Sequence, residues 1–162
     1  MYHGDDKGLV LPPRVANVQV IIVPIPYKGK EEKVNAAVEQ IYMDLKSKDL
    51  RVQKDLRDIY NPGWKFNHWE VKGVPIRIEV GPKDVENKEV KVVIRHSGDK
   101  MQLSWENLAG ELHVLLEKIQ DQMYQKALNK FNEKAKVASN WQDFMSFLNN
   151  RNVVLTPWCR KA

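Results

Sequence analysis

Apolar residues recur along this chain in blocks whose spacing switches between strand-like and helix-like. Residues 18–25 read Val-Gln-Val-Ile-Ile-Val-Pro-Ile, and this nearly unbroken apolar run predicts a central strand buried on both faces of a parallel sheet. Over residues 29–48 the apolar positions fall every three or four residues, which predicts an amphipathic helix. Its apolar stripe consists of Val34, Ala37, Val38, Ile41 and Leu45. Residues 50–55 return to a short strand.

The middle of the chain alternates between a helical segment and several short strands. Asn61-Pro62-Gly63 predicts a turn before a helix over residues 64–71, which Gly73 ends. Alternating or β-branched residues then predict strands separated by turn sequences. The strand-like segments are residues 74–80, 89–94 and 101–103, with turns at 81–84 and 97–99.

The last third of the chain is dominated by a helical pattern. Residues 105–136 carry one long apolar stripe, with Ser104 as the N-cap. A heptad repeat fits this stripe poorly, so we expect a helix lying on the sheet and not a coiled coil. Asn140 precedes a short capped helix, and residues 153–155 predict a strand that opens a structure the chain does not complete.

These elements predict an α/β fold with a mixed, mostly parallel central sheet flanked by helices. Paired prolines at positions 12 and 13 favour extended backbone, so residues 1–16 are interpreted as an arm or linker, with order beginning at Val18. Residues 17–136 are expected to form the main domain. Residues 137–162 are expected to be the truncated start of a further C-terminal domain.

Charge and composition narrow the function only slightly. The chain has 26 basic and 21 acidic residues, a net charge of +5 and a pI near 9.2, which is mild for a protein that binds nucleic acid. Residues 51–100 hold 11 Lys or Arg against 8 Asp or Glu, so a polyanion would be drawn weakly to that segment. The absence of a long apolar run and of a signal peptide predicts a soluble, cytoplasmic protein without a membrane partner.

Residues 63–84 carry the strongest candidate chemistry. Trp64, Phe66 and Trp69 supply flat apolar faces within this segment, and hydrogen-bonding side chains recur beside them. Proteins that read single-stranded RNA combine these two features. The alternative is that the aromatic rings belong to the core and the charges are merely solvated. The hydrogen-bonding residues are Glu70, Arg77 and Asp84.

Other candidate motifs point away from a reaction centre. Gly4 to Gly8 lacks the spacing of a phosphate-binding loop, and Asp5 and Asp6 are interpreted as solvated charges. The four histidines have no metal-ligand spacing, and nothing resembles a nucleophile elbow. The single cysteine, Cys159, excludes an internal disulfide and is expected to have no catalytic role. We therefore expect binding surfaces, with no catalytic, cofactor or metal site in this chain.

Several sequence blocks within residues 1–159 occur in the order in which one known protein family has them. They include Gly8-Leu-Val-Leu-Pro-Pro-Arg-Val-Ala16, Gly63-Trp-Lys-Phe-Asn67, Lys72-Gly-Val-Pro-Ile-Arg-Ile-Glu79 and Gly81-Pro-Lys-Asp84. Together they resemble the C-terminal half of prolyl-tRNA synthetase of the eukaryotic and archaeal type. Related domains serve the histidyl, threonyl and glycyl enzymes, but Leu-Pro-Pro-Arg and Gly-Trp-Lys-Phe-Asn favour proline.

The resemblance implies the anticodon-binding fold of class II aminoacyl-tRNA synthetases, which holds the proline anticodon and reads its two guanines. By matching positions, Phe66 would stack or pack at the site, and Glu70 and Asp84 would accept hydrogen bonds. Arg77 would donate to a base edge or a phosphate. The resemblance also implies secondary contacts to the RNA backbone, from Arg95 and Lys100. Carboxylates and arginine suit the exposed edges of guanine, which agrees with these roles.

The resemblance also implies what this chain lacks. The catalytic core of the family, with its ATP and Mg²⁺, would lie before Met1, so the chain alone should not attach proline to tRNA. The parent enzyme is expected to be a homodimer, and one cysteine cannot close the zinc site of some family members. A different class of function stays open, in which the Trp and Leu faces dock a protein partner. A hydrolase acting on mischarged tRNA is a third, more distant possibility.

Overall fold

The computed structural model describes residues 3–25, 27 and 29–158. Cys159, for which a sequence prediction was made, lies outside these residues. The chain divides into two compact units, Met1–Asp121 and Gln122–Ala162.

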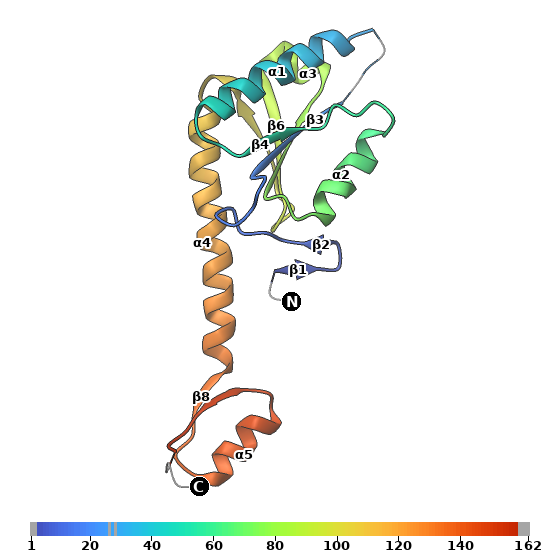
Figure 1. The fold of residues 1–162 in the computed structure, drawn as a ribbon. Helices are drawn as coiled ribbons and strands as arrows, with labels where there is room; N and C mark the ends of the chain where they lie inside the picture. The colour runs from blue at the N-terminus through green and yellow to red at the C-terminus, as the bar shows by residue number, and fades with distance from the viewer. Residues whose placement is uncertain (1–2, 26, 28, 159–162) are drawn as a thin grey trace. The chain divides into compact units, whose positions relative to one another are not determined.

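A five-stranded sheet forms the centre of the first unit (Figure 1), and it is mixed, as the sequence predicted, but not mostly parallel, because two of its four strand pairings are antiparallel. Its strand order is β4-β3-β5-β6-β7; β3 pairs in parallel with β4 and β5, while β6 pairs antiparallel with β5 and β7. All five residues of β3 are buried because the strand has neighbours on both sides and helices on both faces. The strands are β3 (Val20–Pro24), β4 (Val52–Lys54), β5 (Ile76–Val80), β6 (Glu89–Ile94) and β7 (Lys100–Ser104).

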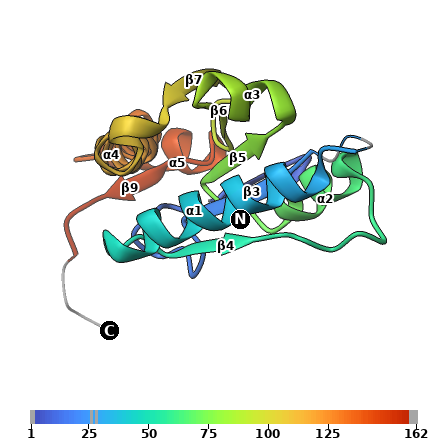
Figure 2. The ribbon, with the colours of Figure 1, turned by 90° about the horizontal axis from the view of Figure 1, so that it is seen from above.

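Two helices pack on opposite faces of the sheet, so each strand side chain points toward one helix or the other. Helix α1 (Glu31–Ser47) lies along β3 and β4 (Figure 2). It buries the stripe predicted from the sequence. Helix α2 (Pro62–Val71) covers the other face, where Ile21 and Val23 pack against its side chains Phe66 and Trp69. Because side chains alternate along a strand, every second residue of β5, β6 and β7 points to the α2 face.

The segment after β5 differs from the sequence prediction. Residues 81–84, predicted as a turn, begin helix α3 (Pro82–Asn87), whose left-handed cap residue Lys88 leads into β6. A proline at the first helical position favours helix initiation, and the Asp84 carboxylate accepts a hydrogen bond from the Gly81 N–H at 2.7 Å. The turn sequence was therefore also a helix start signal.

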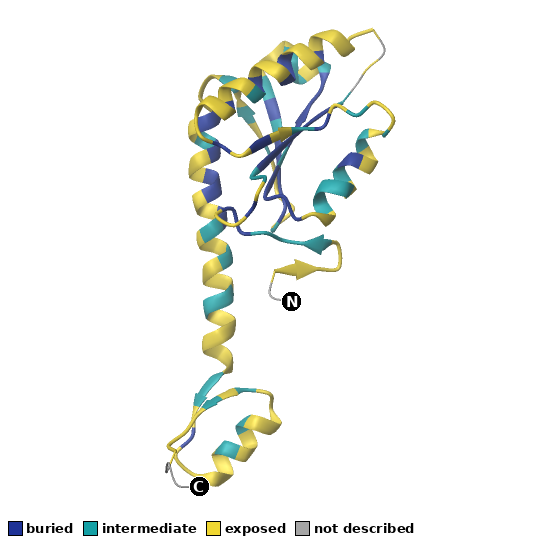
Figure 3. Ribbon diagram, in the orientation of Figure 1, coloured by how far each residue is buried: buried dark blue, intermediate teal, exposed yellow. Residues whose placement is uncertain are grey.

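The long helical stripe is buried only in its first half. Ser104 caps a 3₁₀ turn, η1 (Trp105–Asn107), and helix α4 (Leu108–Lys134) follows. Figure 3 shows the buried positions of α4 confined to the part nearest the sheet. Tyr124 and Phe131 farther along are exposed. The buried residues of α4 are Leu108, Ala109, Leu112, Leu115, Leu116 and Ile119.

Order begins before Val18, contrary to the expectation of an arm. Strands β1 (Gly4–Asp5) and β2 (Gly8–Leu9) form an antiparallel hairpin, and Pro12, Pro13 and Ala16 are buried. The Leu11 N–H donates to the Gly73 carbonyl at 3.1 Å, which ties this segment to the end of α2. The prolines lead into a turn over residues 13–15, in which the Pro12 carbonyl accepts from the Val15 and Ala16 N–H groups at 3.0 and 3.1 Å, and this turn packs on the domain.

The second unit contains a helix and a small parallel sheet. Strand β8 (Ala135–Val137) pairs with β9 (Val153–Leu155), so the predicted C-terminal strand does find a partner within the chain. Because residues 135–137 pair with β9, helix α4 ends at Lys134, two residues before the predicted end at residue 136. Helix α5 (Trp141–Asn149) is capped by Asn140, as predicted, because the Asn140 side chain accepts from the Asp143 N–H.

Candidate nucleic-acid interface

The local sequence fixes where α2 begins and ends. The Asn61 side chain accepts a hydrogen bond from the Trp64 N–H at 2.8 Å, and Pro62 occupies the first turn, where its missing N–H carries no penalty. The helix ends before Gly73, whose φ of 73° is left-handed. These two signals set the helix so that Phe66, Trp69 and Glu70 face the sheet and its edge.

A polar concavity of about 280 Å³ lies between α2, the β6–β7 turn and the N-terminal hairpin. Its floor is one row of residues paired across four strands, Ile21, Arg77, Val93 and Lys100. Four of the six predicted site residues line it. They are Glu70, Arg77, Arg95 and Lys100.

Arg77 lines the concavity and also contacts Phe66, the fifth predicted site residue. Its guanidinium carbon lies 4.3 Å from the centroid of the Phe66 ring, a cation–π distance. Its Nε and Nη2 donate to Glu79 Oε1 at 3.1 and 3.0 Å, and Lys91 pairs with the other Glu79 oxygen at 3.3 Å. Because the Glu79 side chain is only 7% exposed, this carboxylate needs charge compensation, and the 15% exposed Arg77 supplies more of it than the 41% exposed Lys91. Arg77 is thus held in one orientation beside an aromatic ring.

Arg95 is almost fully enclosed by partners within the protein. Its Nη1 and Nη2 donate to the two carboxylate oxygens of Asp5 at 2.7 and 2.6 Å, and its Nε donates to the Glu70 carbonyl at 2.9 Å. Hydrogen bonds from Arg95 hold the pKa of Asp5 well below its ordinary value and exceed the opposing effect of desolvation. Asp5 is therefore a paired carboxylate and not the solvated charge that the sequence suggested.

Glu70 and Lys100 keep more freedom. The Glu70 carboxylate has one ion pair, with Lys7 Nζ at 3.4 Å, and its side chain is 28% exposed. Lys100 is exposed at the start of β7. An accessible carboxylate and an accessible ammonium on one rim can accept from base N–H groups and attract a phosphate, respectively.

Asp84 lies apart from the other predicted residues. Its carboxylate caps α3 through the Gly81 N–H, and it is not among the residues that line the concavity. Its side chain sits at the carboxyl end of β5, whereas the concavity opens beside the start of that strand.

A buried polar cluster next to α2 holds one of the aromatic rings of this helix in place. Asp55 accepts hydrogen bonds from Arg57 Nε at 2.8 Å and from the Trp69 indole N–H at 2.7 Å. Burial alone would raise the pKa of Asp55, but these hydrogen bonds outweigh it and lower the pKa to about 2. Lys65, also buried, donates to the Asp55 carbonyl at 3.2 Å, and desolvation lowers its pKa. The cluster therefore fixes the Trp69 ring, which lines the concavity.

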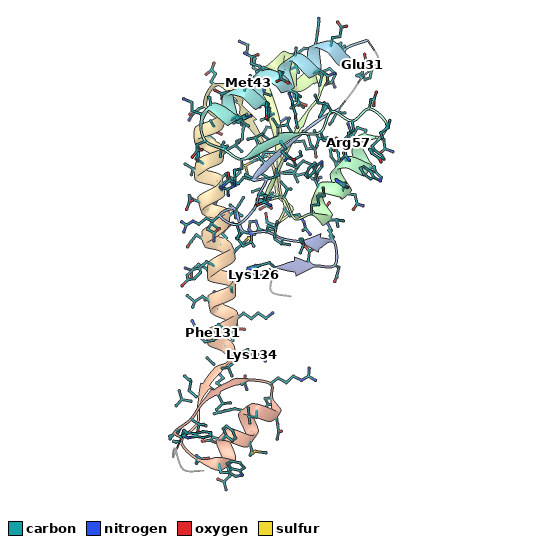
Figure 4. The ribbon with its side chains drawn as sticks, viewed as in Figure 1. Glu31, Met43, Arg57, Lys126, Phe131 and Lys134 are labelled. Carbon is teal, nitrogen blue, oxygen red and sulfur yellow. The ribbon has the colours of Figure 1, made fainter. Side chains whose placement is uncertain are left out.

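The outer side of α2 carries a ladder of stacked rings. Tyr60 and Trp64 stack at 3.8 Å between centroids, and Trp64 and His68 at 4.8 Å. The Arg57 guanidinium lies 5.2 Å from both the Tyr60 and Trp64 rings, beside α2 in Figure 4. Each flat face of Trp64 thus has a partner ring, so Trp64 and Phe66 occupy different surroundings although the sequence grouped them.

Several residues of this site were missed from the sequence. Asp5 and Lys7 reach the concavity from a segment interpreted as a linker. Glu79 and Lys91 were not singled out either, although they are directly opposite in the β5–β6 ladder. The alternation of the two predicted strands was a signal for that pair, because a two-residue offset from Arg77 puts Glu79 on the same face.

The described residues contain neither a candidate metal cluster nor a membrane-spanning helix. No group of three or more His, Cys, Asp or Glu side chains among residues 3–25, 27 and 29–158 is arranged to hold a metal ion. None of the helices in the described part combines the length and apolar character needed to cross a bilayer.

Fold and concavity define an α/β binding domain whose sheet presents aromatic, cationic and carboxylate groups on one face. A family model described as an anticodon binding domain, HGTP_anticodon, matches residues 19–115. The chain belongs to this family, as the resemblance in the sequence indicated.

Curated relatives agree with this assignment. The chain is 44% identical over 160 residues to the cytoplasmic proline–tRNA ligase of Arabidopsis thaliana, covering 98% of this chain and 30% of that protein. It is 42% identical over 158 residues to the proline–tRNA ligase of Pyrococcus horikoshii, covering 97% and 33%. It is 40% identical over 164 residues to the bifunctional glutamate/proline–tRNA ligase of Drosophila melanogaster, covering 98% and 10%. The chain therefore spans a third or less of the length of these relatives.

Proposed function

We propose that this chain is the anticodon-recognition module of a proline–tRNA ligase, which in full attaches proline to its tRNA using ATP. One observation carries the proposal. Glu70, Arg77 and Lys100, from three separate elements, line one concavity, and Arg77 lies over the Phe66 ring. A sheet face with an aromatic ring, hydrogen-bonding side chains and cations can bind unstacked bases.

The proposed roles follow from the surroundings of each side chain. The Glu70 carboxylate accepts hydrogen bonds from the Watson–Crick N–H groups of a guanine. Arg77, oriented by Glu79, donates to a guanine edge or a phosphate, and Phe66 supplies the apolar surface beneath it. Lys100 contacts the phosphate backbone.

Two predicted residues have partners within the protein that shape their proposed roles. Arg95 uses its Nε, Nη1 and Nη2 in bonds to Asp5 and Glu70, so we assign it to holding the wall of the concavity. Asp84 lies beyond the concavity, and it would reach RNA only where the nucleotides extend along β5 to its carboxyl end.

The remaining parts of the proposal concern the whole enzyme. ATP, Mg²⁺ and the attachment of proline are assigned to a catalytic part of a longer protein, in which residues 1–16 follow the catalytic domain and residues 137–162 begin a further domain. The parent is proposed to be a cytoplasmic homodimer. The runner-up function, a protein-docking module, would use the exposed apolar side chains of the second unit, such as Trp141 and Leu155.

Filter binding tests the proposal. The chain should bind a proline tRNA transcript more tightly than the same transcript with both anticodon guanines replaced by adenines. Each good base contact contributes about 1–3 kcal/mol, so the two changes together should weaken binding by at least about 30-fold. Affinity should also fall as salt rises, because lysine and arginine contacts release counterions. Equal affinity for both transcripts would reject the proposed function.

A further inference from the structure

We propose that Asp5, in the N-terminal hairpin, is a specificity-determining positioning residue that occupies Arg95 and so keeps the Glu70 carboxylate available to a base. The inference rests on the proposed function and extends it to a segment outside residues 19–115, the part that the family model matches. The ligand whose recognition Asp5 would affect is the unpaired guanine that Glu70 would read.

Close backbone contacts fix the position of the hairpin. Gly8, with φ of 128°, approaches Val71 so closely that an added Cβ would lie 2.7 Å from the Val71 Cα. Gly73, with φ of 73°, approaches Leu9 in the same way, where an added Cβ would lie 2.6 Å from the Leu9 carbonyl carbon. The two glycines let the hairpin and the end of α2 meet backbone to backbone. Asp5 is thereby placed next to Arg95.

The Asp5–Arg95 pair has the geometry of a strong ion pair. Two parallel N–H···O bonds of 2.7 and 2.6 Å join the planar guanidinium to the carboxylate. The Arg95 side chain is 5% exposed and the Asp5 side chain 44% exposed. Arg95 therefore depends on Asp5 for most of its charge compensation. Asp5 itself is partly exposed, so it can be substituted without opening a cavity in the core.

Glu70 is the carboxylate that Arg95 would turn to without Asp5. The Arg95 Nε already bonds the Glu70 carbonyl, and both side chains line the same concavity. The Glu70 charge also acts on Arg95, adding to the effect of Asp5 in raising its pKa. A guanidinium released from Asp5 has a free fork that fits a carboxylate bidentately. Pairing with Arg95 would consume the oxygens that Glu70 needs for a guanine.

The test compares Asp5→Asn with Asp6→Asn in the full 162-residue chain. Asp6 is the exposed neighbour in the same hairpin, so both variants change the net charge equally. Discrimination is measured as the ratio of affinities for proline tRNA and for transcripts with one anticodon guanine replaced by adenine. In D5N this ratio should fall by a factor of about 5 to 150 at one guanine, the range for one good base contact. In D6N the ratio should stay at the wild-type value.

A double-mutant cycle identifies Glu70 as the residue through which Asp5 acts. Glu70→Gln should reduce discrimination in the wild-type background and have no further effect in the D5N background, because coupled residues are not additive. Uniform weakening for every transcript in D5N, or additive effects of D5N and E70Q, would overturn the inference. So would unchanged discrimination in D5N while the wild type still distinguishes the transcripts. A wild type that fails to distinguish them would instead reject the proposed function, and this inference with it.

A second variant keeps the test decisive if D5N is poorly folded. Arg95→Lys retains a charge for Asp5 but lacks the planar fork that would take both oxygens of Glu70, so it should keep the wild-type discrimination and should limit the loss when combined with D5N. Thermal unfolding of each variant is followed alongside the binding measurements. Loss of folding in both D5N and R95K at the binding temperature would show that the pair is purely structural, and would overturn the inference.

Discussion

The guanidinium of Arg77 lies over the Phe66 ring, 4.3 Å from its centroid, while Glu79 holds the same guanidinium from the side. One residue comes from α2 and the other from β5, so the contact joins the helix to the sheet face that it covers. The arrangement restrains a long, flexible side chain before any ligand binds. Less conformational entropy is then lost when a base or phosphate meets Arg77.

The Arg77–Glu79–Lys91 network predicts an unequal response to removing its two cations. Arg77→Ala leaves the 7% exposed Glu79 carboxylate with Lys91 alone, so the free energy of unfolding should fall by about 1–3 kcal/mol. Lys91→Ala, which removes a 41% exposed side chain, should lower it by about 0–1 kcal/mol. Urea unfolding monitored by tryptophan fluorescence measures both. Equal losses would contradict the burial argument.

The two aromatic environments of α2 predict different effects on RNA binding. Phe66→Leu keeps an apolar side chain but removes the flat ring beneath Arg77, and it should weaken binding of proline tRNA by about 1–3 kcal/mol, the contribution of the base contact that Arg77 makes. Trp64→Leu disrupts the outer ladder with Tyr60 and His68 and should change affinity much less. Fluorescence anisotropy with labelled tRNA measures both. A larger loss in Trp64→Leu would move the binding surface to the outer side of the helix.

Asp55 predicts a loss of stability in acid. Its pKa is about 2 in the folded chain against an ordinary value of 3.8, so the unfolded chain takes up the proton first as the pH falls. The stabilisation is complete above about pH 4 and is lost between about pH 4 and pH 2, and it amounts to about 2 kcal/mol. Asp55→Asn should remove this part of the pH dependence, as measured by urea unfolding across that range. Asp58→Asn, at an exposed neighbour, should retain it.

The close approach of the hairpin to α2 predicts a difference between two glycines. Gly73 and Gly98 both have positive φ, at 73° and 78°, so alanine at either position should cost about 1 kcal/mol of backbone strain. Only Gly73 would place its new Cβ against backbone, whereas nothing lies within 4 Å of the Cβ at Gly98. Gly73→Ala should therefore be the more destabilising in thermal unfolding. Equal midpoints would show that the hairpin yields without cost.

The regular elements could be predicted because their apolar periodicity is local. The stripe of α1 and the β-branched run of β3 both matched the structure. Where prediction failed, a local signal had two meanings or a partner was distant in sequence. Gly81-Pro82 is both a turn and a helix start, and β8 ends the helical pattern of α4 because it pairs with β9.

The site was harder to predict than the fold because it depends on contacts between distant residues. Arg95 and Asp5 are 90 residues apart, and no local pattern marks Asp5 as a partner. Arg77 was singled out from its surroundings in sequence, but its dependence on Glu79 required the register of the strands. Asp84 shows the converse, since its spacing suggested a shared site and the structure places it at the other end of β5.

Amide chemical shifts of the ¹⁵N-labelled chain, titrated with the proline anticodon stem-loop, test the central claim most directly. The claim is that the sheet face beneath α2 binds the anticodon. The largest changes should fall on the residues that line the concavity, including Glu70, Arg77, Val93 and Lys100. Changes concentrated on α1 or on the second unit, with the amides of the concavity unmoved, would contradict the account.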